Sequence, residues 1–213
     1  MATILVTGAG RGIGAALMTA GDAAGHDMIG TTRDGEGGTM PVSMDDPGAI
    51  AEALRDAPPV DILINNAGVI GPARQDPLDM DWAGFAYAFA INTLAPLAVT
   101  QALLPRLRES AAPKVLTISS QMAWMGYRKA DRIAYRASKA AVNKVMQGLA
   151  TRLEPDGIAV ALVDPGWVRT DMGGPEADED PAEVAAGILA IAERLTMDDT
   201  GRFFRFTGEE RAF

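Results

Sequence analysis

Short runs of aliphatic and β-branched residues alternate along the chain with longer, Ala-rich stretches, and Gly, Pro or Asp marks the boundaries. The short runs show little polar alternation, which is typical of strands buried on both faces. They predict strands at 3–7, 26–32, 61–65, 114–119 and 158–164, and an edge strand at 203–206. The Ala-rich stretches predict helices at 14–24, 47–55, 81–109, 135–153 and 181–195.

The order of these elements predicts the fold class. Strands that alternate with helices form right-handed β-α-β crossovers, and these build an α/β, Rossmann-type doubly wound parallel sheet with helices on both faces. A length of 213 residues suits a single domain over 1–213, with a cofactor half at about 1–110 and a catalytic and substrate half at about 111–213. Ligands of such sheets bind at the carboxyl ends of the strands.

Composition narrows the classes of function. The chain has 28 acidic and 19 basic residues and a net charge of −9, which argues against nucleic acid or an anionic membrane as a partner. It has no cysteine and one histidine, His26, so we expect neither a metal site nor a Ser-His-Asp triad. The nearly apolar stretch 83–99 contains Asn92 and Pro96, which favours a buried helix. The N-terminus lacks the features of a signal peptide, so we expect a cytoplasmic location.

A glycine-rich loop follows the first predicted strand. Residues 7–14 read TGAGRGIG, with the spacing T-G-x-x-x-G-x-G and without the lysine of a Walker loop. Glycine leaves no Cβ between the backbone and a pyrophosphate, and the helix that follows offers free N–H groups. A flexible turn is the alternative interpretation. The cofactor contacts expected in this loop are Gly8, Arg11, Gly12, Ile13 and Gly14.

The end of the second strand indicates which dinucleotide is bound. An acid about twenty residues after the loop would bind the ribose of NAD, but this chain has Thr31, Thr32 and Arg33 there. Arg33 and Arg11 suit a 2′-phosphate, so NADP (NADPH) is favoured while NAD stays open. Asp34 weakens this interpretation, and a merely solvated Arg33 is the alternative.

Residues with reactive side chains follow the later strands. Tyr135 and Lys139 stand four apart on one helix face, and an ammonium beside a phenol is expected to lower the pKa of the tyrosine. Such a tyrosine can exchange a proton with a carbonyl or alcohol oxygen, to which Ser120 could also hydrogen-bond. Pro96 has no N–H, so the carbonyl of Asn92 loses its helical partner and could bind water; an ordinary proline kink is the alternative.

In this order, the motifs resemble those of the short-chain dehydrogenase/reductase family over essentially the whole chain. They look most like the bacterial C-factor and sniffer-type carbonyl reductases. The resemblance rests on T-G-x-x-x-G-x-G at 7–14, N-N-A-G at 65–68, Asn92, Ser120, Tyr-x-x-x-Lys at 135–139 and P-G-W-V-R-T at 165–170.

The resemblance implies a role for each motif. Tyr135 would be the general acid/base, and Lys139 would lower its pKa and hold the nicotinamide ribose. Ser120 would orient the substrate oxygen, with Ser119 as a fallback, and Asn92 would hold a relay water. Ser43 stands where many relatives carry an acid that binds adenine. Tyr135 and Lys139 would also contact the cofactor, and further contacts would come from Asn65, Asn66, Ala67, Gly68, Pro165, Gly166, Val168 and Thr170.

Apolar side chains near these motifs suggest a pocket for a small carbonyl or alcohol substrate with a hydrophobic body, although a core or interface role is the alternative for each. They are Met122, Trp124, Met125, Tyr127, Trp167 and Met172. The acidic segment 173–180 predicts a short, mobile loop and an open site, unless it is only a solvated loop.

Two functions fit the sequence. The favoured one is an NADP-dependent oxidoreductase that reduces an aldehyde or ketone with Tyr135 as general acid/base. The alternative is a nucleotide-binding regulatory or signalling protein of the same fold with little turnover. The resemblance also implies that the two long helices at 81–109 and 135–153 could form a homodimer interface.

Overall fold

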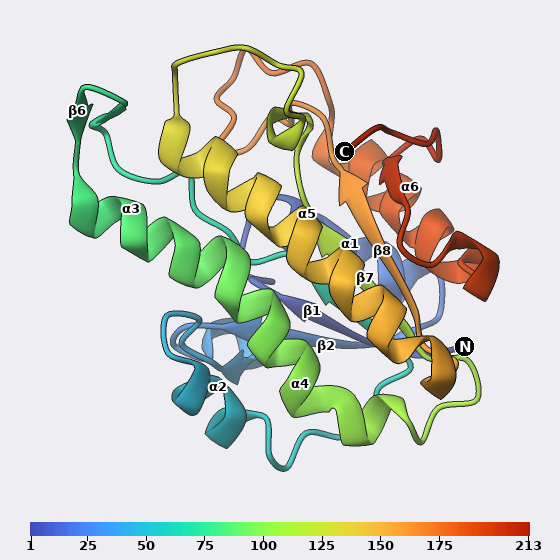
Figure 1. Ribbon diagram of the computed structural model, residues 1–213. Helices are drawn as coiled ribbons and strands as arrows, with labels where there is room; N and C mark the ends of the chain where they lie inside the picture. Colours follow the sequence, from blue (N-terminus) through green and yellow to red (C-terminus); the bar gives the residue numbers. More distant parts are fainter.

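The computed structural model describes residues 1–213 and has a seven-stranded sheet at its centre (Figure 1). The strand order is β3-β2-β1-β4-β7-β8-β9, and every pair is parallel. The doubly wound fold class is therefore confirmed, as is the edge position of the last strand. The strands are β1 (Thr3–Thr7), β2 (Asp27–Thr32), β3 (Met40–Pro41), β4 (Ile62–Asn65), β7 (Lys114–Ile118), β8 (Ala159–Asp164) and β9 (Phe203–Arg205).

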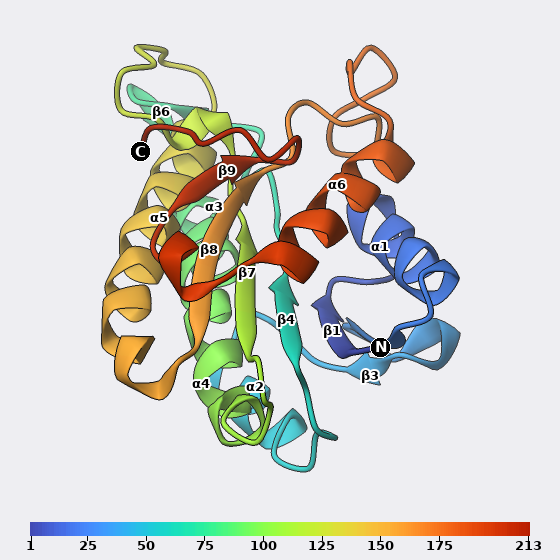
Figure 2. The ribbon, with the colours of Figure 1, turned by 90° about the vertical axis from the view of Figure 1, so that its right-hand side faces the viewer.

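Helices cover both faces of this sheet (Figure 2). On one face lie α1 (Gly12–Ala23) and α6 (Pro181–Arg194). On the other lie α2 (Pro47–Ala53), α4 (Ala95–Leu107) and α5 (Ile133–Leu153). A hairpin of β5 (Gln75–Asp76) and β6 (Asp79–Met80) precedes the helix α3 (Trp82–Phe89), which leads into α4.

The sheet separates two apolar cores. Because side chains alternate along a strand, Ile4 and Val6 of β1 pack under α1 and α6, whereas Leu5 packs under the helices of the other face. The strand β4 divides in the same way, with Ile64 on one side and Leu63 on the other. Burial on both faces explains why the strands lack a polar alternation.

The predicted helix at 81–109 differs most from the observed one. It is divided into α3, a π-helical turn at Ala90–Leu94 and α4, and the three form one continuous path in Figure 1. Pro96 has no N–H to donate to the carbonyl of Asn92, so the helix widens at this point instead of simply kinking. The neighbouring helix α5 begins at Ile133, two residues before the predicted start at Tyr135.

The smaller differences have local causes. The helix α1 begins at Gly12, whose positive φ lets the loop turn directly into the helix. The side chain of Asp46 caps α2 by accepting from the N–H of Gly48. The strands β3, β5 and β6 were not predicted, because two residues are too few for a periodic pattern.

The path Trp82–Leu107 is long and apolar enough to cross a membrane by length and composition, with a mean hydropathy of 1.4 in its 18-residue window. Half of that window is buried inside the protein. A core helix of a sheet protein passes the same test, so this feature is weak evidence for membrane insertion.

Candidate active site

The glycine loop between β1 and α1 forms a tight backbone cradle at the carboxyl end of β1. Gly8 and Gly12 both have positive φ, at 68° and 54°. A Cβ on Gly14 would lie 2.1 Å from the carbonyl oxygen of Gly8, and a Cβ on Gly8 would lie 2.9 Å from the Cα of Ala67. Side chains at these positions would fill the space that a pyrophosphate needs, so the loop fits a dinucleotide.

The segment after β4 is bonded directly to this loop. The hydroxyl of Thr7 accepts from the N–H groups of Asn66 and Ala67, each at 3.0 Å. The amide of Asn66 donates in turn to the carbonyl oxygens of Thr7 and Gly8. The amide of Asn65 is instead turned into the core, toward Thr100 and Thr117. The N-N-A-G motif therefore shapes the cradle through Asn66.

The reactive side chains predicted from the sequence gather at the neighbouring strand ends. Tyr135 and Lys139 are buried on the first turns of α5, and Lys139 Nζ lies 5.9 Å from the centre of the Tyr135 ring. Lys139 Nζ also donates to the carbonyl oxygen of Ile118 at the end of β7, at 2.7 Å. Ser120 follows β7 and hydrogen-bonds with Tyr135. Ser119 bonds to Asn143 in the core, so the site serine is Ser120.

Burial dominates the protonation of this pair. It raises the pKa of Tyr135 to about 12, against a smaller lowering by the hydrogen bond from Ser120. Burial also lowers the pKa of Lys139 to about 8, because the charged ammonium loses its hydration. The expectation that the lysine lowers the pKa of the tyrosine is therefore wrong for the protein without cofactor. The spacing of Tyr135 and Lys139 in the sequence predicts that their side chains are close together, but it does not show how far burial removes them from water.

Asn92 lies in the π-helical turn and joins three segments. Its side-chain oxygen accepts from the N–H of Val69 at 2.8 Å, and its amide donates to the carbonyl of Val69 and to the hydroxyl of Ser138. A Cβ on Gly68 would lie 3.2 Å from this oxygen and 3.7 Å from Lys139 Nζ. Asn92 thus fixes the loop after β4 against α5, next to the buried lysine.

The two arginines expected at a 2′-phosphate are both exposed. Arg33 follows β2, and its neighbour Asp34 accepts hydrogen bonds from Thr32 and Glu36. Arg11 instead forms an ion pair with Asp171 at 3.1 Å, in which both side chains are about four-fifths exposed. Ser43, considered for adenine, donates to Asp45. Arg33 takes part in none of the ion pairs of the chain, although the acids Asp34 and Asp45 lie close enough to feel its charge.

The segment that contains Pro165, Gly166, Val168 and Thr170 closes the other side of the cradle. A Cβ on Gly12 would lie 3.1 Å from the side chain of Thr170, so the two loops approach closely. Two of the four acids in the segment 173–180 have side-chain partners, Glu179 and Asp180. Glu179 pairs with Arg205, and Arg169 donates to two carbonyl groups of the segment, those of Ala177 and Asp178.

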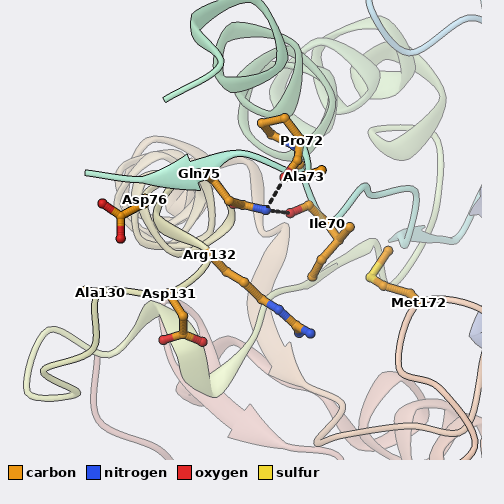
Figure 3. Close-up of a pocket in the computed structure, with 10 residues that line it drawn as sticks. Ile70, Pro72, Ala73, Gln75, Asp76, Ala130, Asp131, Arg132 and Met172 are labelled. Atoms are coloured by element: carbon orange, nitrogen blue, oxygen red, sulfur yellow. Dashed lines mark hydrogen bonds between the residues drawn. The ribbon is translucent and has the colours of Figure 1, made fainter. Parts of the chain in front are cut away.

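A cavity of about 610 Å³ opens beside the first turn of α5, and Figure 3 shows the side chains around it. Ile70, Pro72 and Met172 supply apolar surface, and Arg132 and Gln75 supply polar groups. Of the six apolar side chains expected at a substrate pocket, only Met172 lines this cavity. Trp167 donates to the carbonyl of Gly173, and Trp124, Met125 and Tyr127 are exposed.

Sequence reasoning missed two residues of this site. Gln75 accepts from the N–H of Tyr135 through its side-chain oxygen and so binds the start of α5 to the loop after β4. Asp164, at the end of β8, is fully buried, accepts from the N–H groups of Gln121 and Gly166, and raises the pKa of Tyr135. The position of Asp164 at the carboxyl end of a buried strand was the available signal.

A parallel doubly wound sheet with a glycine cradle after β1 and a buried Tyr-Lys pair defines a dinucleotide-binding α/β protein. The short chain dehydrogenase family model matches residues 44–181. C-signal of Myxococcus xanthus is 42% identical over 153 residues, which cover 71% of this chain and 92% of that protein. The chain therefore belongs to the short-chain dehydrogenase family.

Solved structures of carbonyl reductases have the same fold. An NADPH-bound carbonyl reductase from chicken fatty liver is 27% identical, with a TM-score of 0.91 over 100% of this chain and 99% of that one. Carbonyl reductase Sniffer of D. melanogaster has a TM-score of 0.91 over the whole of both chains at 23% identity, which shows a shared fold. The resemblance to the C-factor and sniffer-type proteins is thereby confirmed.

Proposed function

We propose that the protein is an NADPH-dependent reductase that converts an aldehyde or ketone to an alcohol. One observation carries the proposal: Ser120, Tyr135 and Lys139 meet at the strand ends directly beside the glycine cradle. A module that only binds a nucleotide has no need of a buried phenol and ammonium at this point. The NADPH-bound reductase from chicken supports the choice of cofactor.

The residues present fit NADP. The cradle of Gly8, Gly12 and Gly14, with Arg11 and Ile13 between them, would hold the pyrophosphate at the start of α1. Arg33 and Arg11 would take the 2′-phosphate, which accepts bidentate hydrogen bonds from a guanidinium. The nicotinamide end would meet the two segments that flank the site. Their proposed contact residues are Asn65, Asn66, Ala67, Gly68, Pro165, Gly166, Val168 and Thr170.

When bound, NADPH supplies the hydride that adds to the carbonyl carbon of the substrate. Tyr135 supplies the proton to the carbonyl oxygen, so that hydride and proton together give the alcohol. A raised pKa keeps this phenol protonated at neutral pH, which suits a general acid. Ser120 holds the same oxygen by a hydrogen bond, and Lys139, once charged beside the cofactor, stabilises the phenolate that remains. Asn92 is proposed to hold α5, the helix that carries Tyr135, in position through its hydrogen bond to Ser138.

The test is NADPH oxidation, followed by absorbance, with a panel of aldehydes, ketones, diketones and quinones. We expect turnover that Tyr135→Phe lowers by at least a hundredfold, because general acid catalysis contributes about 10²–10⁴-fold. Binding of NADPH by the variant should stay unchanged, since the phenylalanine keeps the buried ring. Full activity in the variant would contradict the role of Tyr135.

A signalling protein with little turnover is the second candidate. The observation in its favour is that the relative from Myxococcus xanthus is named C-signal. Tight binding of NADPH without turnover of any compound in the panel would favour this candidate over the reductase.

We also propose a homodimer through the long helices. The path from α3 into α4 exposes Trp82, Tyr87 and Leu94, which is a large apolar surface for a monomer to leave in water. Light scattering after size exclusion would detect the dimer, and a single species of about 22 kDa would contradict it. The cytoplasmic location and the lack of nucleic-acid or membrane partners stay predictions.

A further inference from the structure

The wall of the cavity beside α5 contains one residue whose backbone and side chain are both unusual. Arg132 has φ 50° and ψ 43°, and it is the only residue other than glycine with a positive φ. It immediately precedes α5 without capping the helix through its side chain. An arginine gains nothing from this left-handed conformation, where glycine or asparagine is favoured. A strained residue beside a site points to a role for its side chain.

The side chain of Arg132 extends along the cavity wall toward Ile70 and Met172 (Figure 3). Two carboxylates also line this cavity, so the local balance of charge matters. Asp131 forms an ion pair with Arg136 at 2.8 Å, and Arg136 also donates to its backbone carbonyl. Asp76 accepts from the N–H of Leu78. Neither acid is paired with Arg132, whose guanidinium forms no ion pair within the chain.

The local charge contrasts with that of the whole chain. The loop from 121 to 132 contains Arg128, Lys129 and Arg132 but only one acid, Asp131, in a protein with a net charge of −9. The cavity also lies at the N-terminal end of α5, where the helix dipole favours negative charge. Arg132 therefore places a positive charge at this cavity, although the net charge of the whole protein is negative and would repel an anion.

Arg132 is also close to the reacting group. It lies three residues before Tyr135, and its charge lowers the pKa of that phenol slightly against the dominant effect of burial. Gln75, on the cavity wall, accepts from the backbone N–H of Tyr135. A molecule that contacts Arg132 in this cavity therefore lies beside the first turn of α5, the helix that carries Tyr135.

From this geometry we infer that the enzyme prefers carbonyl substrates that carry a carboxylate or another anionic group, which Arg132 binds. The inference rests on the proposed reductase function and names the substrate class for it. A volume of about 610 Å³ suits a small molecule with an apolar middle, which Ile70, Pro72 and Met172 would contact. A planar guanidinium accepts a carboxylate in bidentate geometry, which also fixes the orientation of the substrate.

The test compares two aldehydes of nearly the same size, 4-carboxybenzaldehyde and its neutral amide, 4-carbamoylbenzaldehyde. We expect the wild type to have a KM at least tenfold lower for the carboxylate. Arg132→Asn should abolish this preference and leave the KM of the amide within about twofold, because asparagine tolerates the left-handed backbone. Arg132→Lys should keep part of the preference. Arg128→Gln, a change on the same loop outside the cavity wall, should leave it unchanged.

A second readout is independent of turnover. Calorimetric titration of the corresponding alcohols, 4-(hydroxymethyl)benzoate and its amide, into protein with NADPH should show tighter binding of the benzoate, lost in Arg132→Asn. This result without any turnover would contradict the reductase function and keep the anion site. Equal binding and equal KM values for acid and amide in the wild type would overturn the inference, as would parallel losses for both compounds in Arg132→Asn.

Discussion

At the scale of single residues, burial decides how the reactive groups of this protein are protonated. Tyr135 and Lys139 are the pair that the sequence spacing singles out, yet each is held in its neutral form more strongly than in water. Under the proposed function, the negative charge of NADPH would favour the charged form of Lys139, and the pair would become competent for catalysis only with the cofactor bound.

The buried lysine predicts an unusual pH dependence of stability. The pKa of Lys139 is about 8 when folded and 10.5 when unfolded, so the unfolded chain binds more protons between these values. The free energy of unfolding should rise with pH across this window, and the cost of burying the charge below pH 8 is about 3 kcal/mol. Thermal unfolding from pH 7 to 10 should show a rise in Tm that Lys139→Met lacks.

The control for this experiment is Lys144→Met, which removes an exposed lysine from the same helix. It should retain the rise seen in the wild type. Above pH 10 the sign reverses, because Tyr135 has a pKa of about 12 when folded and about 10 when unfolded, and its contribution is lost between these values. An identical pH profile in the wild type and Lys139→Met would refute the assigned burial.

The ion pair between Arg11 and Asp171 predicts a variant with improved cofactor binding. Asp171→Asn frees Arg11 and removes a negative charge near the proposed phosphate site, so the Kd of NADPH should fall about threefold, the scale of an exposed ion pair. The Kd of NADH should change less. Fluorescence titration measures both, and Arg33→Asp should act in the opposite direction on NADPH. Equal effects on the two cofactors would exclude a 2′-phosphate role.

At the scale of elements, the widened turn between α3 and α4 is the feature that places the site. The π-helical geometry follows from Pro96 and directs the side chain of Asn92 toward Val69 and Ser138. Asn92 thereby joins the long α3–α4 path, the loop after β4 and α5. The sequence predicted that the helix is disturbed at Pro96, but the partners of Asn92 lie 23 and 46 residues away along the chain.

Asn92→Ala should therefore lower the stability of the protein. It leaves the half-buried N–H and carbonyl of Val69 without these partners, which costs about 2 kcal/mol in the free energy of unfolding. Urea denaturation measures this loss. Thr93→Ser, a milder change in the same turn that keeps the hydroxyl bonded to the carbonyl of Ser138, is the control and should cost less. Equal stability of Asn92→Ala and wild type would contradict the joining role.

At the scale of the whole molecule, the end of the chain returns to the site. Arg211 pairs with the fully buried Asp164 at 3.2 Å, and Phe213 packs on Phe203 of β9 with ring centres 5.8 Å apart. Figure 2 shows the C-terminal segment running beside β9 toward the upper end of α5. Because Asp164 raises the pKa of Tyr135, the charge on Arg211 offsets an acid that lies behind the reacting group.

Two arginines of this segment form a matched pair for testing its role. Arg211→Gln leaves the charge of Asp164 buried without its partner, and we expect a loss of about 3 kcal/mol in the free energy of unfolding. Arg202→Gln breaks an exposed pair with Glu210 and should cost less than about 1 kcal/mol. Chemical denaturation of both variants measures the difference, and similar losses would show that Asp164 does not depend on Arg211.

The sequence by itself determined the order of strands and helices, the parallel sheet and the positions of the glycine cradle, Ser120, Tyr135 and Lys139. These follow from periodicity and from short motifs, because both act within a few residues of the chain. Only the tertiary structure decided which of these groups are charged, that Asp164 pairs with Arg211, and that Arg132 lines the cavity beside Tyr135. Desolvation and contacts between distant segments depend on how the whole chain packs, and the local sequence pattern does not predict that packing.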